Sequence, residues 1–417
     1  MAHKYDEMYH LEKSIPDYWA LKKLKDLAFL VTDRIDVSKV SLENYVSTEN
    51  MLPNKSGIEK AIKMPRYGSV TRFESRDILL SNIRPYFKKI WLAKFNGGCS
   101  NDVLVIKAKN DVSHSFLYYC LQQDPFFNYV TSSSKGTKMP RGDKVAIFSF
   151  EFPVPPLDEQ KAIAKILSDL DSKIELNEKM NKTLETIAQA IFKHWFIDFE
   201  FPNEEGKPYK SSGGEMVDSE LGSIPKGWKV KYFKDIVHLN MGVSPKGTSY
   251  NTDGIGVPLL NGAADFSSGI IEPKKFTTNP VRMCKKGDLL FCIRATIGNL
   301  TYSDKAYCIG RGVAALDPVS EVYKEYSYFT LEYGLNNLIL KASGSVIKGL
   351  SKDDLLLFKI VTPTDKIISK FHLLVATIFS RIQYLTVENH SLSNIRDSLL
   401  PKLMTGKIRV PMEDEHE

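Results

Sequence analysis

The sequence predicts an α+β fold in which two tandem-repeated α+β domains are separated by two long helices that form an antiparallel coiled coil. Three observations support this fold class. The 417-residue chain repeats itself at an offset near half its length, each copy mixes short strand-like segments with turn residues, and each copy ends in a long helical pattern. A chain of this length also exceeds what one hydrophobic core usually serves.

The repeat consists of four stretches that recur in the same order. "SIPDYWALKKLKDLA" from Ser14 matches "SIPKGWKVKYFKDIV" from Ser223 at an offset of 209 and keeps a tryptophan in each copy, Trp19 and Trp228. "RDILLSNIRP" echoes "GDLLFCIRAT", which places Arg84 opposite Arg294. "FLYYCL" and "AIFSFEFPVPP" match "YSYFTL" and "LLLFKIVTPTD" at offsets near 210. Together these matches indicate two copies that fill the chain.

Each copy combines strands with a helix. "DVLVIKA" and "VAIFSFEF" are predicted to be strands, because they are rich in β-branched and aromatic residues and are bounded by turn residues. "SHSFLYYCLQQD" predicts a helix in the first copy, and "EYSYFTLEYGLNNLIL" predicts one at the matching place in the second.

The first long helix is expected to begin at Asp158, which is placed to act as its N-cap. From Asp158 to Trp195 it would span roughly 57 Å at 1.5 Å per residue. Alternating steps of four and three residues give an a/d seam, which predicts a coiled coil. The seam consists of Ile163, Leu167, Leu170, Ile174, Asn177, Asn181, Leu184, Ala188, Ile191 and Trp195.

The second long helix carries a similar seam with a slip at Ile395/Arg396, and Pro401 is expected to bend or fray its last turn. Its seam consists of Phe371, Val375, Ile378, Ile382, Leu385, Asn389, Leu392, Leu399 and Leu403. A buried asparagine in each seam can fix the register if its partner lies opposite. Neither helix should be stable alone, so we favour pairing between them over the alternative that each packs on its own domain.

Composition describes a folded protein of mild charge. The net charge of +6, from 56 basic and 50 acidic residues, is compatible with nucleic acid but too small to establish it. Five cysteines without a C-x-x-C pair argue against a disulfide framework or a zinc ribbon. No apolar run approaches the roughly 20 residues of a membrane span. We therefore expect a cytoplasmic protein that does not associate with membranes.

Motifs for catalysis and for metal binding are not found. The sequence has no phosphate-binding G-x-x-x-x-G-K-[ST] loop and no histidines at metal-ligand spacing. One nuclease-like group exists, in which Asp265, Glu272 and Lys274 could bind Mg²⁺ and activate water. The alternative for these residues is a turn with solvated charges, which is the commoner use of so short a pattern.

Several turn-rich stretches mix basic, hydroxyl and aromatic residues and recur at matching places in both copies. Lysine and arginine neutralise phosphates, and hydroxyl groups can bond phosphate oxygens or base edges. The candidate DNA-binding residues are Arg84, Tyr86, Lys88, Lys89, Lys135, Thr137, Lys138 and Arg141 in the first copy and Lys246, Thr248, Tyr250, Arg294, Thr296, Lys341, Ser345 and Lys348 in the second.

The chain resembles the DNA-specificity subunit of type I restriction–modification systems over nearly its whole length. The resemblance lies in "PVPPLDEQKAIAKIL", in the run from Phe192 to Trp228, and in "RDSLLPKLMTGKI" from Arg396. It implies two target-recognition domains that each read half of a bipartite, asymmetric DNA site. It also implies a coiled-coil ruler that docks two copies of an adenine-N6 DNA methyltransferase subunit, and a restriction and translocase subunit in the full complex.

By this resemblance the chain has no active site and no cofactor of its own, and S-adenosylmethionine, ATP and Mg²⁺ belong to the partner subunits. The expected regions are recognition domain 1 (1–157), spacer helix 1 (158–200), recognition domain 2 (201–365), spacer helix 2 (366–406) and a C-terminal tail (407–417). Two other functions remain open on the residues alone: a self-contained Mg²⁺-dependent endonuclease, and a coiled-coil scaffold without DNA specificity.

Overall fold

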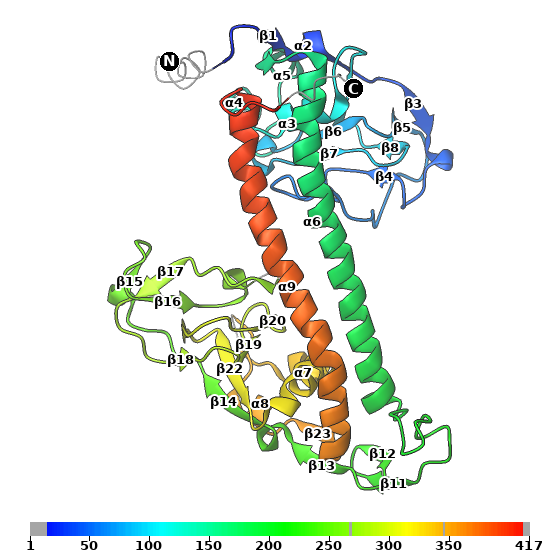
Figure 1. Ribbon diagram of the computed structural model, residues 1–417, viewed down its shortest axis with the longest axis vertical. Coiled ribbons are helices and arrows are strands. Elements are labelled where there is room, and N and C mark those ends of the chain that lie inside the picture. Colours follow the sequence, from blue (N-terminus) through cyan, green and yellow to red (C-terminus); the bar gives the residue numbers. More distant parts are fainter. Residues whose placement is uncertain (1–14, 267–268, 345–346, 412–417) are drawn as a thin grey trace. The chain divides into compact units, whose positions relative to one another are not determined.

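The computed structural model describes residues 15–266, 269–344 and 347–411. The chain divides into two units (Figure 1). Unit 1 contains residues 1–174 together with 391–417, and unit 2 contains residues 175–390. Each unit therefore includes a stretch of both long helices, α6 (Leu157–Phe192) and α9 (Asp365–Met404). The predicted α+β class is confirmed.

Unit 1 is built on two four-stranded sheets. In the first, all neighbours are antiparallel, in the order β2 (Ala28–Leu30), β9 (Val103–Ala108), β6 (Ile78–Ser81) and β7 (Ile90–Leu92). The second has the order β3 (Arg34–Asp36), β5 (Ser69–Phe73), β8 (Gly97–Cys99) and β4 (Tyr45–Val46), with β4 and β8 parallel. A separate antiparallel pair joins β1 (Ala20–Lys23) to β10 (Glu151–Val154).

Helices cover the first sheet of unit 1. They are α2 (Leu24–Leu27), α3 (His114–Leu121), α4 (Asp124–Ser132) and α5 (Lys144–Ser149). The core joins apolar residues from these helices and the sheet to Ile163 and Leu167 of α6 and to Leu400 and Leu403 of α9. Both ends of the chain therefore contribute to the same core, because Trp19 belongs to it as well.

Unit 2 repeats this plan. Its first sheet has the order β14 (Val237–Met241), β22 (Val313–Pro318), β19 (Leu289–Cys292) and β20 (Leu300–Tyr302). Its second has the order β15 (Tyr250–Asn251), β17 (Lys275–Thr277), β16 (Val257–Leu260), β21 (Tyr307–Ile309) and β18 (Met283–Cys284), with β16 and β21 parallel. Two further antiparallel pairs are β13 (Lys229–Tyr232) with β23 (Lys359–Thr362) and β11 (Met216–Ser219) with β12 (Gly222–Pro225). The helices are α7 (Lys324–Lys341) and α8 (Lys352–Leu356).

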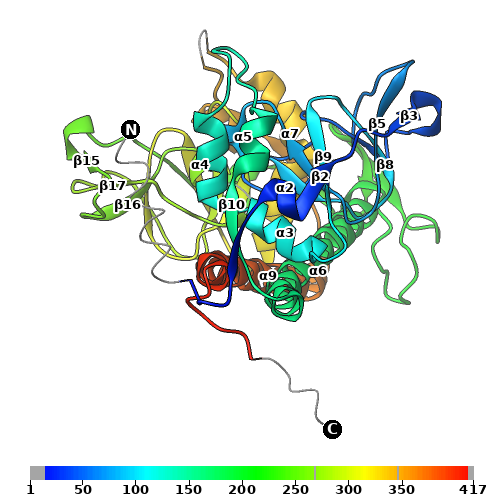
Figure 2. The same ribbon diagram turned by 90° about the horizontal axis from the view of Figure 1, so that it is seen from above.

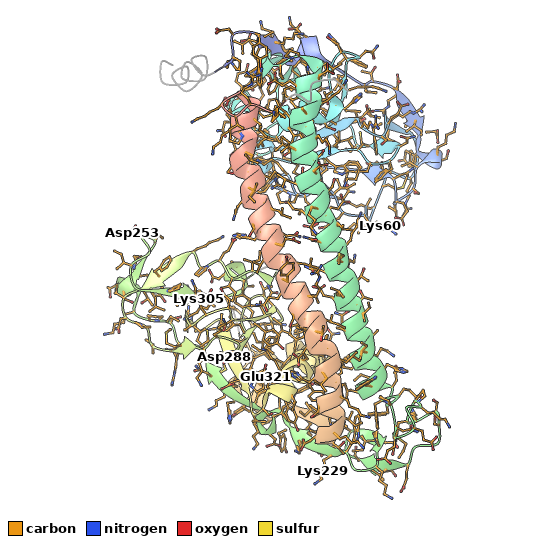
Figure 3. The ribbon with its side chains drawn as sticks, in the orientation of Figure 1. Lys60, Lys229, Asp253, Asp288, Lys305 and Glu321 are labelled. Carbon is orange, nitrogen blue, oxygen red and sulfur yellow. The ribbon has the colours of Figure 1, made fainter. Side chains whose placement is uncertain are left out.

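The internal repeat is thus present in three dimensions. The four strands of each first sheet follow the same order, and each second sheet contains one parallel pair beside an antiparallel one. The second sheets differ at their edges, where unit 1 adds β3 and unit 2 adds β17 and β15. The hairpin-like tip next to β15 carries Asp253 (Figure 3).

Two local predictions were wrong. "VAIFSFEF" contains helix α5 before strand β10, because the Asp143 side chain accepts from the Val145 amide at 2.9 Å and caps a helix there. Helix α6 begins at Leu157, so Asp158 lies inside its first turn and pairs with Lys161 instead of capping it. Helix α9 extends through Pro401 to Met404, and the bend or fraying expected at Pro401 stays a prediction.

Within each unit, α6 and α9 lie side by side and run antiparallel (Figures 1 and 2). In unit 2, Asn177 bonds Asn389 and Asn181 bonds Thr386, so the partner number falls as the α6 number rises. In unit 1, Asp171 on α6 pairs with Arg396 on α9, the residue at the predicted slip. Every predicted seam residue is buried or half-buried.

The seam asparagines meet across the helices of unit 2. Asn177 is fully buried, and its Nδ2 donates to Asn389 Oδ1 at 2.8 Å and to Glu388 Oε2 at 2.6 Å. Pairs of this kind cost stability but tolerate few other registers. In the part of the chain that the structure describes, no helix is both long enough and apolar enough to cross a membrane.

Candidate nucleic-acid interface

Two of the loops predicted to bind DNA lie side by side in unit 1. Loop A1 (82–89) follows β6, and loop B1 (133–143) connects α4 to α5. An antiparallel bridge joins Ile83 in loop A1 to Arg141 in loop B1, and Arg141 also pairs with Lys135 within loop B1. Backbone hydrogen bonds therefore hold the two loops together before any ligand binds.

A third loop, C1 (100–102), lies between β8 and β9 and contacts both of the others. The Asn82 amide donates to the Asp102 carbonyl at 2.8 Å, and Arg141 Nη2 lies 2.9 Å from Asp102 Oδ1. Sequence reasoning missed loop C1, because it contains no lysine or arginine. The signal that could have found it is its recurrence, 210 residues later, as the turn that contains Arg311.

Unit 2 brings together the three equivalent loops. They are loop A2 (293–299) after β19, loop B2 (described residues 342–344 and 347–350) between α7 and α8, and loop C2 (310–312) between β21 and β22. Arg294 bridges to Gly349, and the Ile293 amide donates to the Gly312 carbonyl at 2.9 Å. Of the predicted residues, Ser345 lies outside the described residues.

The predicted equivalence of Arg84 and Arg294 was wrong by one position. The Arg84 amide donates to the Pro140 carbonyl, and in unit 2 the corresponding bond runs from the Ala295 amide to the Lys348 carbonyl. Arg84 and Ala295 are also both left-handed, with φ of 49° and 60°. The sequence match failed because loop A2 is one residue shorter than loop A1.

Several predicted cations of unit 1 already have partners in the protein. Lys88 Nζ lies 2.8 Å from Asp124, Lys135 Nζ lies 2.6 Å from Asp143, and Lys89 donates to the Thr48 carbonyl. Hydrogen bonds from these lysines lower the pKa of Asp124 and of Asp143, so both carboxylates stay charged at neutral pH. Burial lowers the pKa of Lys89.

Other predicted residues are open to solvent. Tyr86 is 48% exposed, and its ring lies 4.7 Å from that of Phe87 between centroids, so loop A1 presents an aromatic pair. Thr137, Lys138, Lys246, Thr248, Thr296, Lys341 and Lys348 are also exposed. Arg294 and Tyr250 are half-buried, and Lys275 lies 5.9 Å from the centre of the Tyr250 ring. Unit 1 thus presents basic, hydroxyl and aromatic groups on loops A1 and B1. In unit 2, basic and hydroxyl groups lie on the described parts of loops A2 and B2, whereas the aromatic ring of Tyr250 belongs to β15.

The comparison with known proteins agrees with this arrangement. The family model described as "Type I restriction modification DNA specificity domain" matches twice, over residues 16–186 and 225–384. The chain belongs to this family. Each match covers the sheets of one unit and continues into the long helix that follows them, so the two specificity domains are the two copies of the internal repeat.

Two proteins described as specificity subunits are similar to this chain over nearly the whole length of both sequences. The MjaIX specificity subunit of a type I restriction enzyme from Methanocaldococcus jannaschii is 28% identical, with 95% of each chain covered. The HindI specificity subunit from Haemophilus influenzae is 24% identical, with 94% of this chain and 99% of the other covered. A crystal structure of a type I restriction–modification S subunit from M. genitalium shares the fold, with a TM-score of 0.58 at 18% identity and coverage of 94% and 96%.

The nuclease-like residues of the second specificity domain have structural contacts. Asp265 is buried, and its Oδ2 accepts from the Asn261 amide at 2.7 Å and from the Gly262 amide at 3.2 Å, which fixes the turn after β16. Glu272 faces His390, with 3.6 Å between Oε1 and Nδ1. Among the described residues, no group of three His, Cys, Asp or Glu side chains is placed to hold a metal ion. The endonuclease alternative is not favoured.

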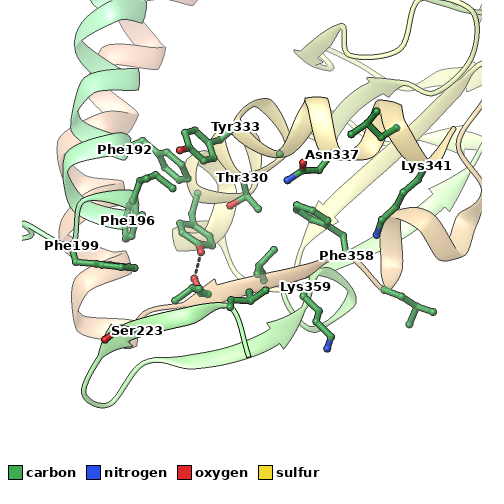
Figure 4. A pocket seen from close by; sticks show the side chains of 18 residues that line it. Phe192, Phe196, Phe199, Ser223, Thr330, Tyr333, Asn337, Lys341, Phe358 and Lys359 are labelled. Carbon is green, nitrogen blue, oxygen red and sulfur yellow. Dashed lines mark hydrogen bonds between the residues drawn. The ribbon is translucent and has the colours of Figure 1, made fainter. Parts of the chain in front are cut away.

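The second specificity domain also contains a cavity of about 910 Å³ between the end of α6, α7 and β23 (Figure 4). Its lining is mainly aromatic and aliphatic, with Phe192, Phe196, Tyr333 and Phe358 among the residues shown, and Lys341 beside Phe358. The described lining residues include no carboxylate, histidine or cysteine. This composition suits apolar contact, and the ionisable groups in the described lining are two lysines, Lys341 and Lys359, and two tyrosines, Tyr326 and Tyr333.

Proposed function

We propose that this chain is the sequence-reading, non-catalytic subunit of a type I restriction–modification complex and acts on double-stranded DNA in the cytoplasm. In this proposal each specificity domain binds one half of a bipartite site through loops A, B and C. The observation that supports it best is the occurrence of the same three-loop cluster, held by the same backbone hydrogen bonds, in both domains.

We further propose that the two half-sites differ in sequence. The loop scaffolds match, but the side chains on them do not: loop A1 offers Tyr86 and Lys88, whereas loop A2 offers Thr296 and no lysine. Because base edges are distinguished by the donors and acceptors that meet them, different side chains on one scaffold select different bases. The site is therefore asymmetric.

The long helices are proposed to set the spacing between the half-sites and to dock two copies of an adenine-N6 methyltransferase subunit. Both helices pass from one unit into the other, and each unit pairs them by buried contacts. Methyl transfer would use S-adenosylmethionine in that partner, and cleavage would use ATP and Mg²⁺ in restriction and translocase subunits.

Single-molecule methylome sequencing tests this function. A host that expresses the chain with its methyltransferase should show adenine methylation at a bipartite, asymmetric motif. Exchange of residues 1–157 for those of another family member should change one half of the motif and leave the other half intact. Methylation without such a motif, or none above the level of the methyltransferase alone, would refute the proposal and favour the scaffold alternative.

The spacer is tested by inserting seven residues into α6 and seven into the facing stretch of α9, which keeps both apolar seams in phase. We expect the gap between the half-sites to lengthen while both half-sites stay unchanged. Substitution of seven exposed α6 residues, without insertion, is the control. An unchanged gap in the insertion variant would contradict the ruler.

A further inference from the structure

Loop C2 of unit 2 carries an arginine that lies at the meeting point of the recognition loops. Arg311 is exposed and stands between Gly310 and Gly312. Its backbone amide donates to Ser244 Oγ at 3.3 Å, whereas its guanidinium has no hydrogen bond or ion pair within the part of the chain that the structure describes. The side chain is therefore available to an external ligand.

The backbone that carries Arg311 is fixed on both sides. The Gly310 amide donates to the Leu260 carbonyl at 2.8 Å, and the Gly312 carbonyl accepts from the Ile293 amide of loop A2 at 2.9 Å. A Cβ at Gly312 would lie 2.1 Å from the Asn261 carbonyl oxygen, and a Cβ at Gly310 would lie 2.6 Å from Asn261 Oδ1. Only glycine fits at position 312, where the close atom is backbone, whereas a side chain at position 310 would require the Asn261 side chain to move. This loop therefore presents Arg311 from a backbone that is fixed on both sides.

Loop C2 is also bound to the segment that precedes Lys246. The Gly242 amide donates to the Val313 carbonyl and the Val243 amide donates to the Ile309 carbonyl, each at 3.0 Å. Together with the Ser244 contact, these bonds place Arg311 between the segment 242–250 and loop A2, and both carry predicted DNA-binding residues. Its position is central in the loop cluster.

Unit 1 shows different chemistry at the equivalent position. Asn101 stands there, and its Oδ1 accepts from Arg34 Nη1, while the same guanidinium bonds Ser69 and Thr71 at 3.2 and 3.3 Å. In unit 1, Arg34 is thus bound by other residues of the protein, and loop C1 presents the amide side chain of Asn101. In unit 2 the loop presents a guanidinium that has no partner among the residues that the structure describes.

We propose that Arg311 reads a guanine in the half-site bound by unit 2. A guanidinium donates two parallel hydrogen bonds to O6 and N7 of guanine in the major groove, which is the commonest specific contact between arginine and DNA. A rigid backbone favours base reading, because a base edge requires closer alignment than a phosphate does. The inference rests on the proposed function and assigns one base-reading residue within it.

The test is methylome sequencing of hosts that express the methyltransferase with the wild-type chain, R311A, R311K or K305A. Lys305 (Figure 3) is the matched control, since it is exposed and precedes β21. Arg311 follows that strand. We expect R311A and R311K to relax one G·C position in one half-site, with about ten- to hundredfold less discrimination there. K305A should keep the wild-type motif. The relaxed half should be the one that exchange of residues 1–157 leaves unchanged.

Each other outcome overturns the assignment. If R311K keeps the full motif while R311A weakens methylation equally at all sites, Arg311 contacts phosphate and not a base. If both variants keep the wild-type motif and efficiency, Arg311 does not contact DNA. If the relaxed position lies in the other half-site, Arg311 does not read the half-site bound by unit 2. Failure of the wild-type chain to direct methylation to a bipartite motif would instead refute the proposed function, so the two failures are distinguishable.

Discussion

The first sheet of each unit has the same strand order, but the helices that pack beside this sheet differ between the two units. In unit 1 the chain after β9 forms two short helices, α3 and α4, and Phe126 of α4 is fully buried against Phe150 and Phe152, with ring centroids at 5.5 and 5.9 Å. In unit 2 the corresponding segment is the single helix α7, and Phe358, the counterpart of Phe150, lines the open cavity of Figure 4.

The helix sequences account for this difference. Pro125 stands in the first turn of α4 and favours a new helix start after Leu121, which turns Phe126 toward the sheet. In α7, Gly334 lets the helix approach Phe358 closely, since a Cβ there would lie 2.6 Å from the ring. Strand order and loop hydrogen bonds are conserved between the units while helix packing and loop side chains vary. The scaffold therefore tolerates changes of specificity.

The largest expected effect comes from removing residues 391–417, because unit 1 depends on this segment and unit 2 does not. The deletion takes the buried side chains of Leu400, Leu403, Met404 and Val410 out of the core of unit 1. At about 1.5–3 kcal/mol for each buried side chain, the loss is comparable to the whole stability of a domain. Arg409, which pairs with the buried Glu159 at 3.1 Å, is lost as well.

Hydrogen exchange measures this effect in the two units separately. We expect amides of β6 and β9 to lose protection and amides of β19 and β22 to keep it. A chain that ends at Pro411 retains every described contact and should behave like the full chain. Equal protection of unit 1 in both truncated chains would show that α9 is dispensable for its fold.

The next largest effect on stability is expected from truncating a side chain that packs beside the sheet. Phe126→Ala should destabilise unit 1 by about 3–5 kcal/mol, because it empties a fully buried aromatic site. Asn337→Ala, at the cavity in unit 2, should change stability by less than about 0.5 kcal/mol. Native-state hydrogen exchange in each unit provides both values. Similar losses at the two positions would mean that the cavity of unit 2 is packed as tightly as unit 1.

The helix pairing also differs between the units, with an ion pair in unit 1 and an amide pair in unit 2. Asn177→Leu removes the donor to Asn389 and Glu388, and we expect unit 2 to lose about 1–3 kcal/mol. The double variant Asn177→Leu/Asn389→Leu should recover this loss, because facing leucines suit an apolar seam. Lys182→Leu on the exposed face of α6 is the control. A double variant less stable than the single one would show that the asparagine pair stabilises the seam and does not cost stability.

Regular features were predictable from the sequence because they repeat. The apolar seams follow from periodicity, and the strand DVLVIKA follows from its β-branched residues and flanking turns. The offset near 210 reveals the two copies and gives the place of the helix at Lys324–Lys341. Helix α5 was not predictable in this way. Its aromatic and β-branched residues favour a strand. The helix forms instead because the Asp143 side chain accepts hydrogen bonds from the amides of its first turn and caps it.

The recognition loops were found only in part, because their clustering depends on contacts far apart in sequence. The Asn82 amide donates to the Asp102 carbonyl of loop C1, and the Asn82 carbonyl accepts from the Gly142 amide of loop B1. No local sequence pattern predicts either hydrogen bond. Arg311 escaped selection for the same reason, since it stands alone between two glycines and not in a basic run. Loop chemistry is readable from sequence, whereas the pairing of the loops requires the fold.

The smallest effect concerns the charge balance of loop A1. Asp124 binds Lys88 at 2.8 Å and Lys55 at 3.3 Å, and these lysines lower its pKa. Because the folded-state pKa is lowered, the carboxylate stays charged at neutral pH, and its contribution to stability is lost only as the pH falls through that lowered value. The ion pairs are therefore constant between pH 6 and 8 and compete with phosphate throughout that range.

Asp124→Asn removes the ion pairs of both lysines, so that Lys88 is freed for phosphate and Lys55 keeps only its bond to the Gln122 carbonyl at 3.1 Å. Under the proposed function we expect affinity for DNA of unrelated sequence to rise about two- to fivefold at low salt, with a steeper salt dependence and an unchanged methylation motif. Asp111→Asn is the matched control, because Asp111 is exposed and follows β9, whereas loop C1 precedes that strand. Affinity measured against salt concentration for both variants decides the point. An equal rise in the two variants would assign the effect to net charge and would remove loop A1 from the phosphate-binding surface.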